Sequence, residues 1–193
     1  MNRFIADLHL GHKNMLSFDS RPFETIEEND NFIIDNWNYT VDFNDDVYIL
    51  GDISWYNSTK TIEIMKQLNG NKHLIIGNHD KRLLKNPKLR NEFVEICDYK
   101  EITFDDGTGL ILCHYPIIAF KNHYYGWIHL YGHTHNTWEN DVVVRAIKDS
   151  IEVSGKPCRM YNVGVMMPEI WYQPRTLSEI LKAYGDERYD IYG

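Results

Sequence analysis

Eight side chains of the types that bind metal ions or move protons each follow a short apolar run in this 193-residue chain. Aspartate carboxylates, histidine imidazoles and an asparagine amide are oxygen and nitrogen donors, which suit divalent ions such as Mn, Fe, Co, Ni or Zn. The set is too large for one tetrahedral ion, so it predicts a site for two divalent transition-metal ions that share a carboxylate. Its members are Asp7, His9, Asp52, Asn78, His79, His114, His133 and His135.

One such residue beside a strand has an ordinary explanation. A histidine there is usually a satisfied core or surface residue, and an aspartate usually caps a helix or forms a turn. Here, however, five of the nine histidines stand directly after an apolar run, and three of the motifs carry a glycine beside the donor. Gly51, Gly77 and Gly132 permit sharp turns and close backbone approach to a bound group. The joint pattern therefore favours a binding site.

The elements that must position these side chains are short strands. Residues 47–50 form an apolar run that predicts a buried parallel strand, whose carboxyl end presents Asp52 to a crevice. Such crevices are where open α/β sheets bind their ligands. The runs before the other donors predict further strands at 3–6, 73–76, 110–113 and 127–131, with 99–104 pairing with 110–113 as a hairpin.

Helices are predicted between these strands. Capping boxes that begin at Thr25 and Thr176 each open a helix, and a third helix covers 59–68. Residues 136–160 are the hardest part to assign, because Val142-Val143-Val144 fits either a strand or the start of a helix. The whole, 1–193, is most simply one α/β domain.

Composition narrows the class of protein. Hydrophobic residues at 43% and charged residues at 25% are typical of a soluble globular protein, and no apolar stretch predicts a membrane span or a signal peptide. Three widely spaced cysteines argue against a disulfide framework and a thiolate zinc site, so we expect a cytoplasmic protein. A formal net charge of -8 makes extended nucleic acid an unlikely partner, whereas bound metal ions would allow a small phosphorylated substrate.

The order of the motifs resembles the calcineurin-like metallophosphoesterase signature. The matching runs are Asp7-x-His9, Gly51-Asp52, Gly77-Asn78-His79-Asp80, His114 and Gly132-His133-x-His135. The resemblance spans about two-thirds of the chain. It implies a four-layer αββα sandwich of two mixed β-sheets flanked by helices, with a dinuclear metal site at the carboxyl ends of the strands.

The resemblance also implies a role for each residue. Asp7, His9, Asp52 and His135 would hold the first metal, and Asp52, Asn78, His114 and His133 the second. Asp52 would then bridge the two ions. His79 matches the family's catalytic histidine, which protonates the leaving oxygen. The nucleophile would be a metal-bridging hydroxide, so no covalent phospho-enzyme is expected.

Other residues near the motifs have two interpretations each. Asp80 either orients His79 or caps a helix. His12 either faces the substrate or is an ordinary surface histidine. Arg82, like Lys13 and Lys81, either contacts a phosphate oxygen or is a solvated loop charge.

Departures from the signature narrow the activity. Ile53-Ser54-Trp55, after Asp52, lacks the arginine of the protein Ser/Thr phosphatases and the tyrosine ligand of the purple acid phosphatases. The chain is also shorter than the DNA-repair nucleases, which leaves the small single-domain bacterial or phage-type phosphoesterases. The missing arginine favours a phosphodiester, such as a cyclic or linear nucleotide, because a monoester's extra charge benefits more from a fixed guanidinium. The alternatives are a non-catalytic scaffold that binds proteins, disfavoured by the complete ligand set, and a single-strand nuclease, disfavoured by charge.

Overall fold

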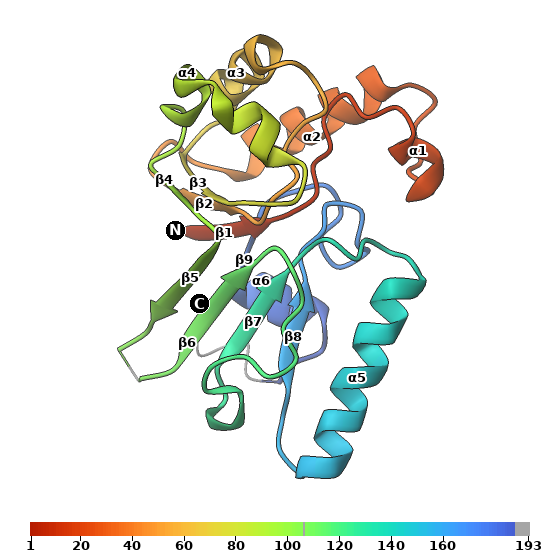
Figure 1. The fold of residues 1–193 in the computed structure, drawn as a ribbon, viewed down its shortest axis with the longest axis vertical. Helices are drawn as coiled ribbons and strands as arrows, with labels where there is room; N and C mark the ends of the chain where they lie inside the picture. Colours follow the sequence, from red (N-terminus) through yellow and green to blue (C-terminus); the bar gives the residue numbers. More distant parts are fainter. Residues whose placement is uncertain (106, 188–193) are drawn as a thin grey trace.

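The strands of the chain form two mixed β-sheets with helices packed around them (Figure 1). A computed structural model describes residues 1–105 and 107–187. Residues 106 and 188–193, which belong to the predicted domain 1–193, lie outside the described residues. This architecture agrees with the mixed α/β class that the sequence predicts.

The first sheet has the strand order β4-β3-β2-β1-β9. Its four parallel strands are β1 (Asn2–Ile5), β2 (Asp46–Ile49), β3 (Asn71–Ile75) and β4 (Glu95–Cys97). The short β9 (Arg175–Thr176) pairs antiparallel with β1. The sequence predicts the first three strands to within two residues. It gives no signal for β4 and β9, which are too short to show a period.

The second sheet has the order β5-β6-β7-β8. The predicted hairpin is confirmed as β5 (Tyr99–Thr103) and β6 (Gly109–Cys113), which pair antiparallel. The strands β7 (Ile128–Tyr131) and β8 (Arg159–Asn162) continue the sheet in parallel with β6.

The helices begin where their caps predict. Thr25 and Thr176 complete capping boxes at the starts of α2 (Ile26–Thr40) and α6 (Leu177–Ala183). Asn57 caps α3 (Ser58–Gln67), and a long α5 (Trp138–Ser154) fills the stretch that the sequence left unassigned. The short elements are α1 (Met15–Phe18), η1 (Asp80–Lys85), α4 (Pro87–Arg90) and η2 (His123–Tyr125). In the described part of the chain, no helix is both long and apolar enough to cross a membrane.

The core lies on both faces of the second sheet. Leu110 and Leu112 of β6 join one large cluster with apolar residues of the first sheet and of α2, α3 and α6. Ile111, which points the opposite way, joins a second cluster with Val143 of α5. This alternation is that of a strand buried on both sides. Helices therefore cover faces of both sheets, as in an α/β sandwich.

The two sheets meet beyond the carboxyl ends of their parallel strands. Ala6, just after β1, donates its N–H to the Val163 carbonyl and accepts from the Val165 N–H, both at 2.8 Å. In the second sheet, the Gly132 N–H donates to the His114 carbonyl at 2.9 Å. These bonds join the segments that follow β1, β6, β7 and β8. The residues just past those strands are thereby held in one place.

A buried ion pair fastens the first two strands at their other ends. Asp45 accepts hydrogen bonds from the Arg3 guanidinium at 2.8 Å and from the Met1 amino group at 2.6 Å. Burial acts to raise the pKa of Asp45, but these hydrogen bonds outweigh it and lower the pKa to about 2. The folded protein therefore favours the ionised carboxylate.

Asp45→Asn is expected to lower the free energy of unfolding by about 2 kcal/mol at pH 7. A depressed carboxylate pKa stabilises the fold above the unfolded value near 4, and this contribution is lost as the pH falls from there toward 2. Urea unfolding of both proteins between pH 2 and 7 measures the difference. If the difference in free energy of unfolding between the two proteins stayed constant over this range, the charge of Asp45 would contribute nothing to stability.

Candidate metal centre

All eight predicted site residues lie where the two sheets meet. Asp7 and His9 follow β1, Asp52 follows β2, and Asn78 and His79 follow β3. From the second sheet, His114 follows β6, and His133 and His135 follow β7. Five strand ends far apart in the sequence thus supply one cluster of side chains, as the parallel register of β1, β2 and β3 requires.

Asp52 occupies the middle of this cluster. Its Oδ2 atom lies 3.6 Å from His9 Nε2, 3.7 Å from His114 Nε2 and 3.9 Å from His79 Nε2. Its Oδ1 atom accepts the backbone N–H of His79 at 3.0 Å. The carboxylate is almost fully buried, with 2% of the side chain exposed. One oxygen is therefore fixed by the backbone while the other faces three imidazoles.

Two overlapping groups of donors could each hold a metal ion. Asp7, His9 and His135 offer atoms that lie within 4.8 Å of one another, and so do Asp7, Asp52 and His114. In the first group, the Nε2 atoms of His9 and His135 are 3.3 Å apart. Asp7 belongs to both groups, which adds a second carboxylate able to lie between the two positions.

Asn78 and His133 extend the second group. The Asn78 Oδ1 atom lies 2.9 Å from His114 Nε2 and 3.1 Å from His133 Nδ1. His114 Nδ1 lies 2.8 Å from the Leu50 carbonyl, which can only accept a hydrogen bond, so Nε2 is the ring nitrogen that faces Asn78. Imidazole nitrogens and an amide oxygen then lie together beside the Asp52 carboxylate. Because all of these are metal ligands in other proteins, the donor set fits a metal ion.

Two glycines make room for this packing. A Cβ on Gly77 would lie 2.2 Å from Asp52 Oδ1, and a Cβ on Gly51 would lie 2.5 Å from His114 Nδ1. Gly51 also has a positive φ of 88°. Side chains at these positions would displace the donor groups directly. The glycines noted in the sequence thus serve the close approach that they predict.

The backbone is strained at most of the donors. Among residues 1–105 and 107–187, nine non-glycine residues have a positive φ, and five of these are predicted ligands. L-residues seldom adopt this left-handed conformation, and it persists where surrounding structure imposes it, often at functional sites. The five are Asp7 (56°), His9 (48°), Asp52 (57°), His133 (69°) and His135 (51°).

Burial sets the protonation of the deepest donors. Burial raises the pKa of Asp7, and the pKa of His9 lies well below its usual range because of burial and then the charge of His135. For His135, burial acts to lower the pKa, but the Asp19 and Asp7 carboxylates outweigh it and raise the value. His9 is therefore held as the neutral imidazole that a metal ion requires.

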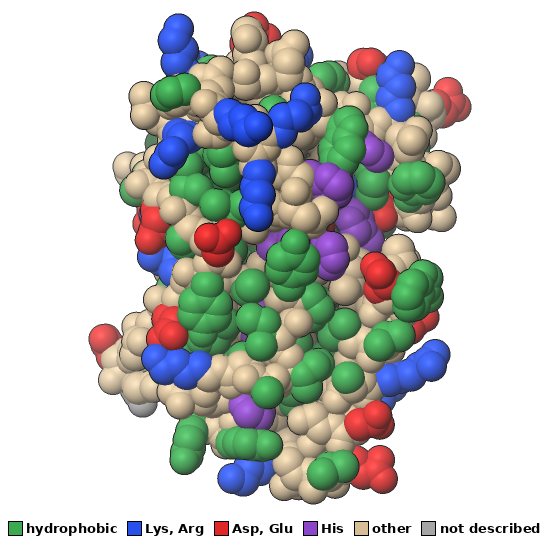
Figure 2. Space-filling model, viewed as in Figure 1, with side chains coloured by type: hydrophobic (Ala, Val, Ile, Leu, Met, Phe, Trp, Pro, Cys, Tyr) green, Lys and Arg blue, Asp and Glu red, His purple; other side chains and the backbone are tan. Residues whose placement is uncertain are grey.

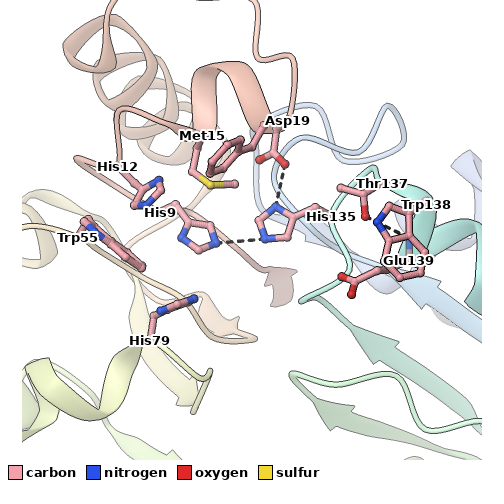
Figure 3. Close-up of a pocket in the computed structure, with 11 residues that line it drawn as sticks. His9, His12, Met15, Asp19, Trp55, His79, His135, Thr137, Trp138 and Glu139 are labelled. Carbon is pink, nitrogen blue, oxygen red and sulfur yellow. Dashed lines mark hydrogen bonds and ion pairs between the residues drawn. The ribbon is translucent and has the colours of Figure 1, made fainter.

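Asp19 and Arg21 support the site, and the sequence did not point to them. Asp19 Oδ1 lies 2.9 Å from His135 Nδ1, which turns the Nε2 atom of that ring into the cluster (Figure 3). Arg21 pairs with Asp19 at 2.9 Å and donates to the carbonyls of Asp7 at 3.0 Å and Leu8 at 3.1 Å. Both stand in an irregular loop, where no period or spacing marks them.

Asp80 contacts the backbone rather than the His79 ring. Its fully buried carboxylate accepts N–H groups of Asp52 and Ile53 at 2.9 Å and of Gly77 at 2.8 Å. It therefore fixes the turns that carry the donors. Neither sequence interpretation, orienting His79 or capping a helix, describes these contacts.

Two open pockets flank the cluster and share Trp55 and His79. The first, of about 560 Å³, includes His9, His12 and His135 in its lining, and the second, of about 510 Å³, includes Lys81 and Arg82. His12 packs its ring against Trp55, with ring centroids 4.1 Å apart. His79 differs from the buried donors, because 43% of its side chain is exposed. It is placed to meet a bound molecule.

The chain has relatives whose functions are not described. No family model matches it. It is 33% identical over 153 residues to the uncharacterized protein MJ1445 of Methanocaldococcus jannaschii, covering 78% of each chain. It is 28% identical over 157 residues to the gene 66 protein of Mycobacterium phage D29, covering 69% of this chain and 77% of that protein.

A solved structure shares the fold. The protein of unknown function AQ665 from Aquifex aeolicus is similar with a TM-score of 0.68 and 28% identity, covering 94% of this chain and 98% of that one. The likeness to the Pseudomonas putida nuclease MPE is weak, with a TM-score of 0.39 and 19% identity over 69% of this chain and 60% of that one.

Proposed function

The chain belongs to the family of the Methanocaldococcus jannaschii protein MJ1445, and we propose that it is a metal-dependent phosphoesterase of the calcineurin-like superfamily. The observation that carries the proposal is the clustering of seven side chains with oxygen or nitrogen donors around Asp52, which is one of them. The exposed His79 lies beside this cluster. The donor types, their burial and the approach of Asn78 Oδ1 to His114 Nε2 at 2.9 Å support a cation site.

Each residue has a place in this proposal. Asp7, His9, Asp52 and His135 would hold one divalent cation, and Asp52, Asn78, His114 and His133 a second. Bound there, such ions supply positive charge for the phosphoryl oxygens and acidify a water molecule. Asp19 and the Leu50 carbonyl hold the histidine rings so that Nε2 faces inward.

His79 would handle the proton of the leaving oxygen. Its Nε2 atom faces Asp52 Oδ2 at 3.9 Å, and its ring lines both pockets. An imidazole at this boundary can hold a proton at Nε2 and release it to an oxygen that leaves the phosphorus.

The surroundings favour a diester over a monoester. The Arg21 guanidinium pairs with Asp19 and donates to the backbone carbonyls of Asp7 and Leu8, so it holds the loop rather than a substrate phosphate. Among the described residues that line the two pockets, the only lysine and arginine are Lys81 and Arg82, both exposed. A monoester gains more than a diester from a rigid guanidinium, and the site provides none.

The purified protein is expected to bind about two transition-metal ions per chain and to hydrolyse bis-p-nitrophenyl phosphate when Mn is added. Inductively coupled plasma mass spectrometry counts the metal, and p-nitrophenolate absorbance follows the reaction. Chelator-treated protein, restored with each divalent ion in turn, is the control. A protein that binds no metal and shows no turnover with any of them would rule out the phosphoesterase.

A further inference from the structure

We propose that the substrate is a single-stranded oligonucleotide, whose next backbone phosphate binds Lys81 and Arg82 and whose base enters the aromatic pocket. The inference rests on the proposed function, since it places the scissile phosphodiester at the metal centre. It names the substrate class, which the donor set alone leaves open.

The second pocket is shaped for an anion. Ser54, Asn78 and His79 line it together with Lys81 and Arg82, so it opens directly from the metal centre. Arg82 rests its guanidinium against the carbonyls of Trp55 and Tyr56, each at 3.4 Å. This contact places the cation at the edge of the pocket while leaving other N–H groups for a ligand.

The basic character continues beyond the pocket. Residues 81–90 of η1 and α4 carry five lysines and arginines and no acidic residue, although the chain has a net charge of -8. Among the described residues, no carboxylate forms an ion pair with Lys81, Arg82, Lys85, Lys88 or Arg90. Figure 2 shows lysine and arginine side chains gathered beside the histidines of the site. Local charge, rather than net charge, is what a polyanion meets.

The first pocket has the opposite character. Phe18 and Trp138 line it with 66% and 72% of their surfaces exposed, and Met15 and Trp55 add two further apolar side chains. Figure 3 shows Trp55 and Trp138 on opposite sides of the histidines. Exposed aromatic faces stack on nucleobases, and each such contact contributes about 1–3 kcal/mol. A base must leave a duplex to stack in this way, so the strand is single.

The two pockets together match the repeat of a nucleic-acid strand. They lie on either side of the shared Trp55 and His79, one apolar and one cationic. A nucleotide chain presents a base and a phosphate alternately, and its scissile phosphate would then lie between them. A cyclic mononucleotide or a simple phosphodiester has no second phosphate to use the cationic pocket.

The test is binding of a fluorescein-labelled ten-nucleotide strand, deoxythymidine or uridine, followed by fluorescence anisotropy across a salt series. His79→Ala serves as the parent, because its turnover is suppressed. Adding Lys81→Gln and Arg82→Gln removes the contacts to one phosphate, so the slope of log K against log[salt] should become less steep by about 0.7. Over the tenfold change from 1 M to 0.1 M salt, the variant should therefore gain about fivefold less affinity than the parent.

Two further variants make the result specific. Trp138→Ala should weaken binding about tenfold with no change of slope, since stacking is not ionic. Lys148→Gln, an exposed lysine on α5 that lines neither pocket, is the matched control and should bind like the parent. The two strand chemistries separate a DNA from an RNA substrate.

The outcomes distinguish this inference from the proposed function. With His79 intact, Lys81→Gln and Arg82→Gln should lower kcat/KM for the strand about tenfold more than for bis-p-nitrophenyl phosphate. An equal loss would place both cations on the scissile phosphate and overturn the inference. So would strand binding weaker than about 1 mM by a protein that still hydrolyses the small diester. Tight binding by a protein without phosphodiester turnover would instead refute the phosphoesterase and keep the strand site.

Discussion

Asp52→Asn should remove metal from both positions of the site and lower phosphodiester turnover by a thousandfold or more, on the order of the loss of a principal electrostatic group. The Oδ2 atom of Asp52 lies within 3.6–3.9 Å of three imidazoles, so one substitution affects both donor groups. An amide replaces an anion with a weak neutral donor there. Metal content and bis-p-nitrophenyl phosphate hydrolysis measure the two losses.

The Asp52→Asn variant should still fold. Asparagine tolerates the positive φ of 57° at position 52, and its amide oxygen can accept the His79 N–H as Oδ1 does. Unchanged circular dichroism would therefore accompany the loss of metal. If Asp52→Asn kept two ions and full turnover, the carboxylate would be outside the metal centre.

Asp19→Asn provides a graded comparison for Asp52→Asn. Asp19 contacts the predicted ligands through His135 Nδ1, so its loss should weaken metal binding about 10–100-fold rather than abolish it. Metal titration gives the affinity, and turnover at saturating metal should largely recover. Failure to recover would mean that Asp19 does more than hold the ring.

His79→Ala is expected to keep the metal and lower kcat about 10²–10⁴-fold. The link between residue 79 and Asp52 Oδ1 is a backbone N–H, which alanine retains. The ring itself is 43% exposed, unlike the buried donors. Removal of the ring should therefore lower kcat without disturbing the predicted metal ligands.

Substrates with different leaving groups distinguish proton donation by His79 from other roles of this residue. A p-nitrophenolate leaves easily without a proton, whereas an alkoxide does not, so the loss in His79→Ala should be larger for an alkyl leaving group. His123→Ala, in a histidine that interacts with the Phe120 carbonyl away from the site, is the matched control. Loss of metal from His79→Ala would make His79 a ligand instead.

The sequence predicts which side chains come together because the rule behind that prediction is local. A strand that ends at a glycine and a donor places that donor at the sheet's edge, and parallel pairing of β1, β2 and β3 then brings Asp7, Asp52 and Asn78 together. Capping boxes locate α2 and α6 for the same reason, because both partners lie within four residues.

What the sequence misses depends on distant contacts. Asp19 gains its role from His135, more than a hundred residues away, and Asp80 gains its role from backbone groups of another strand end. The helix α5 is obscured by its β-branched run, Val142–Val144, of which only Val143 is buried. Because so few apolar residues of α5 are buried, its sequence shows little of the hydrophobic period that marks a helix.

The left-handed backbone at five predicted ligands would make bound cations partners in folding as well as in the proposed reaction. At about 1 kcal/mol each, this strain amounts to about 5 kcal/mol, a large share of the 5–15 kcal/mol that stabilises an ordinary domain. Ions that bind only the folded chain return stability according to their concentration and affinity. A cell depleted of such ions would therefore lose more than the reaction, because less of the protein would stay folded.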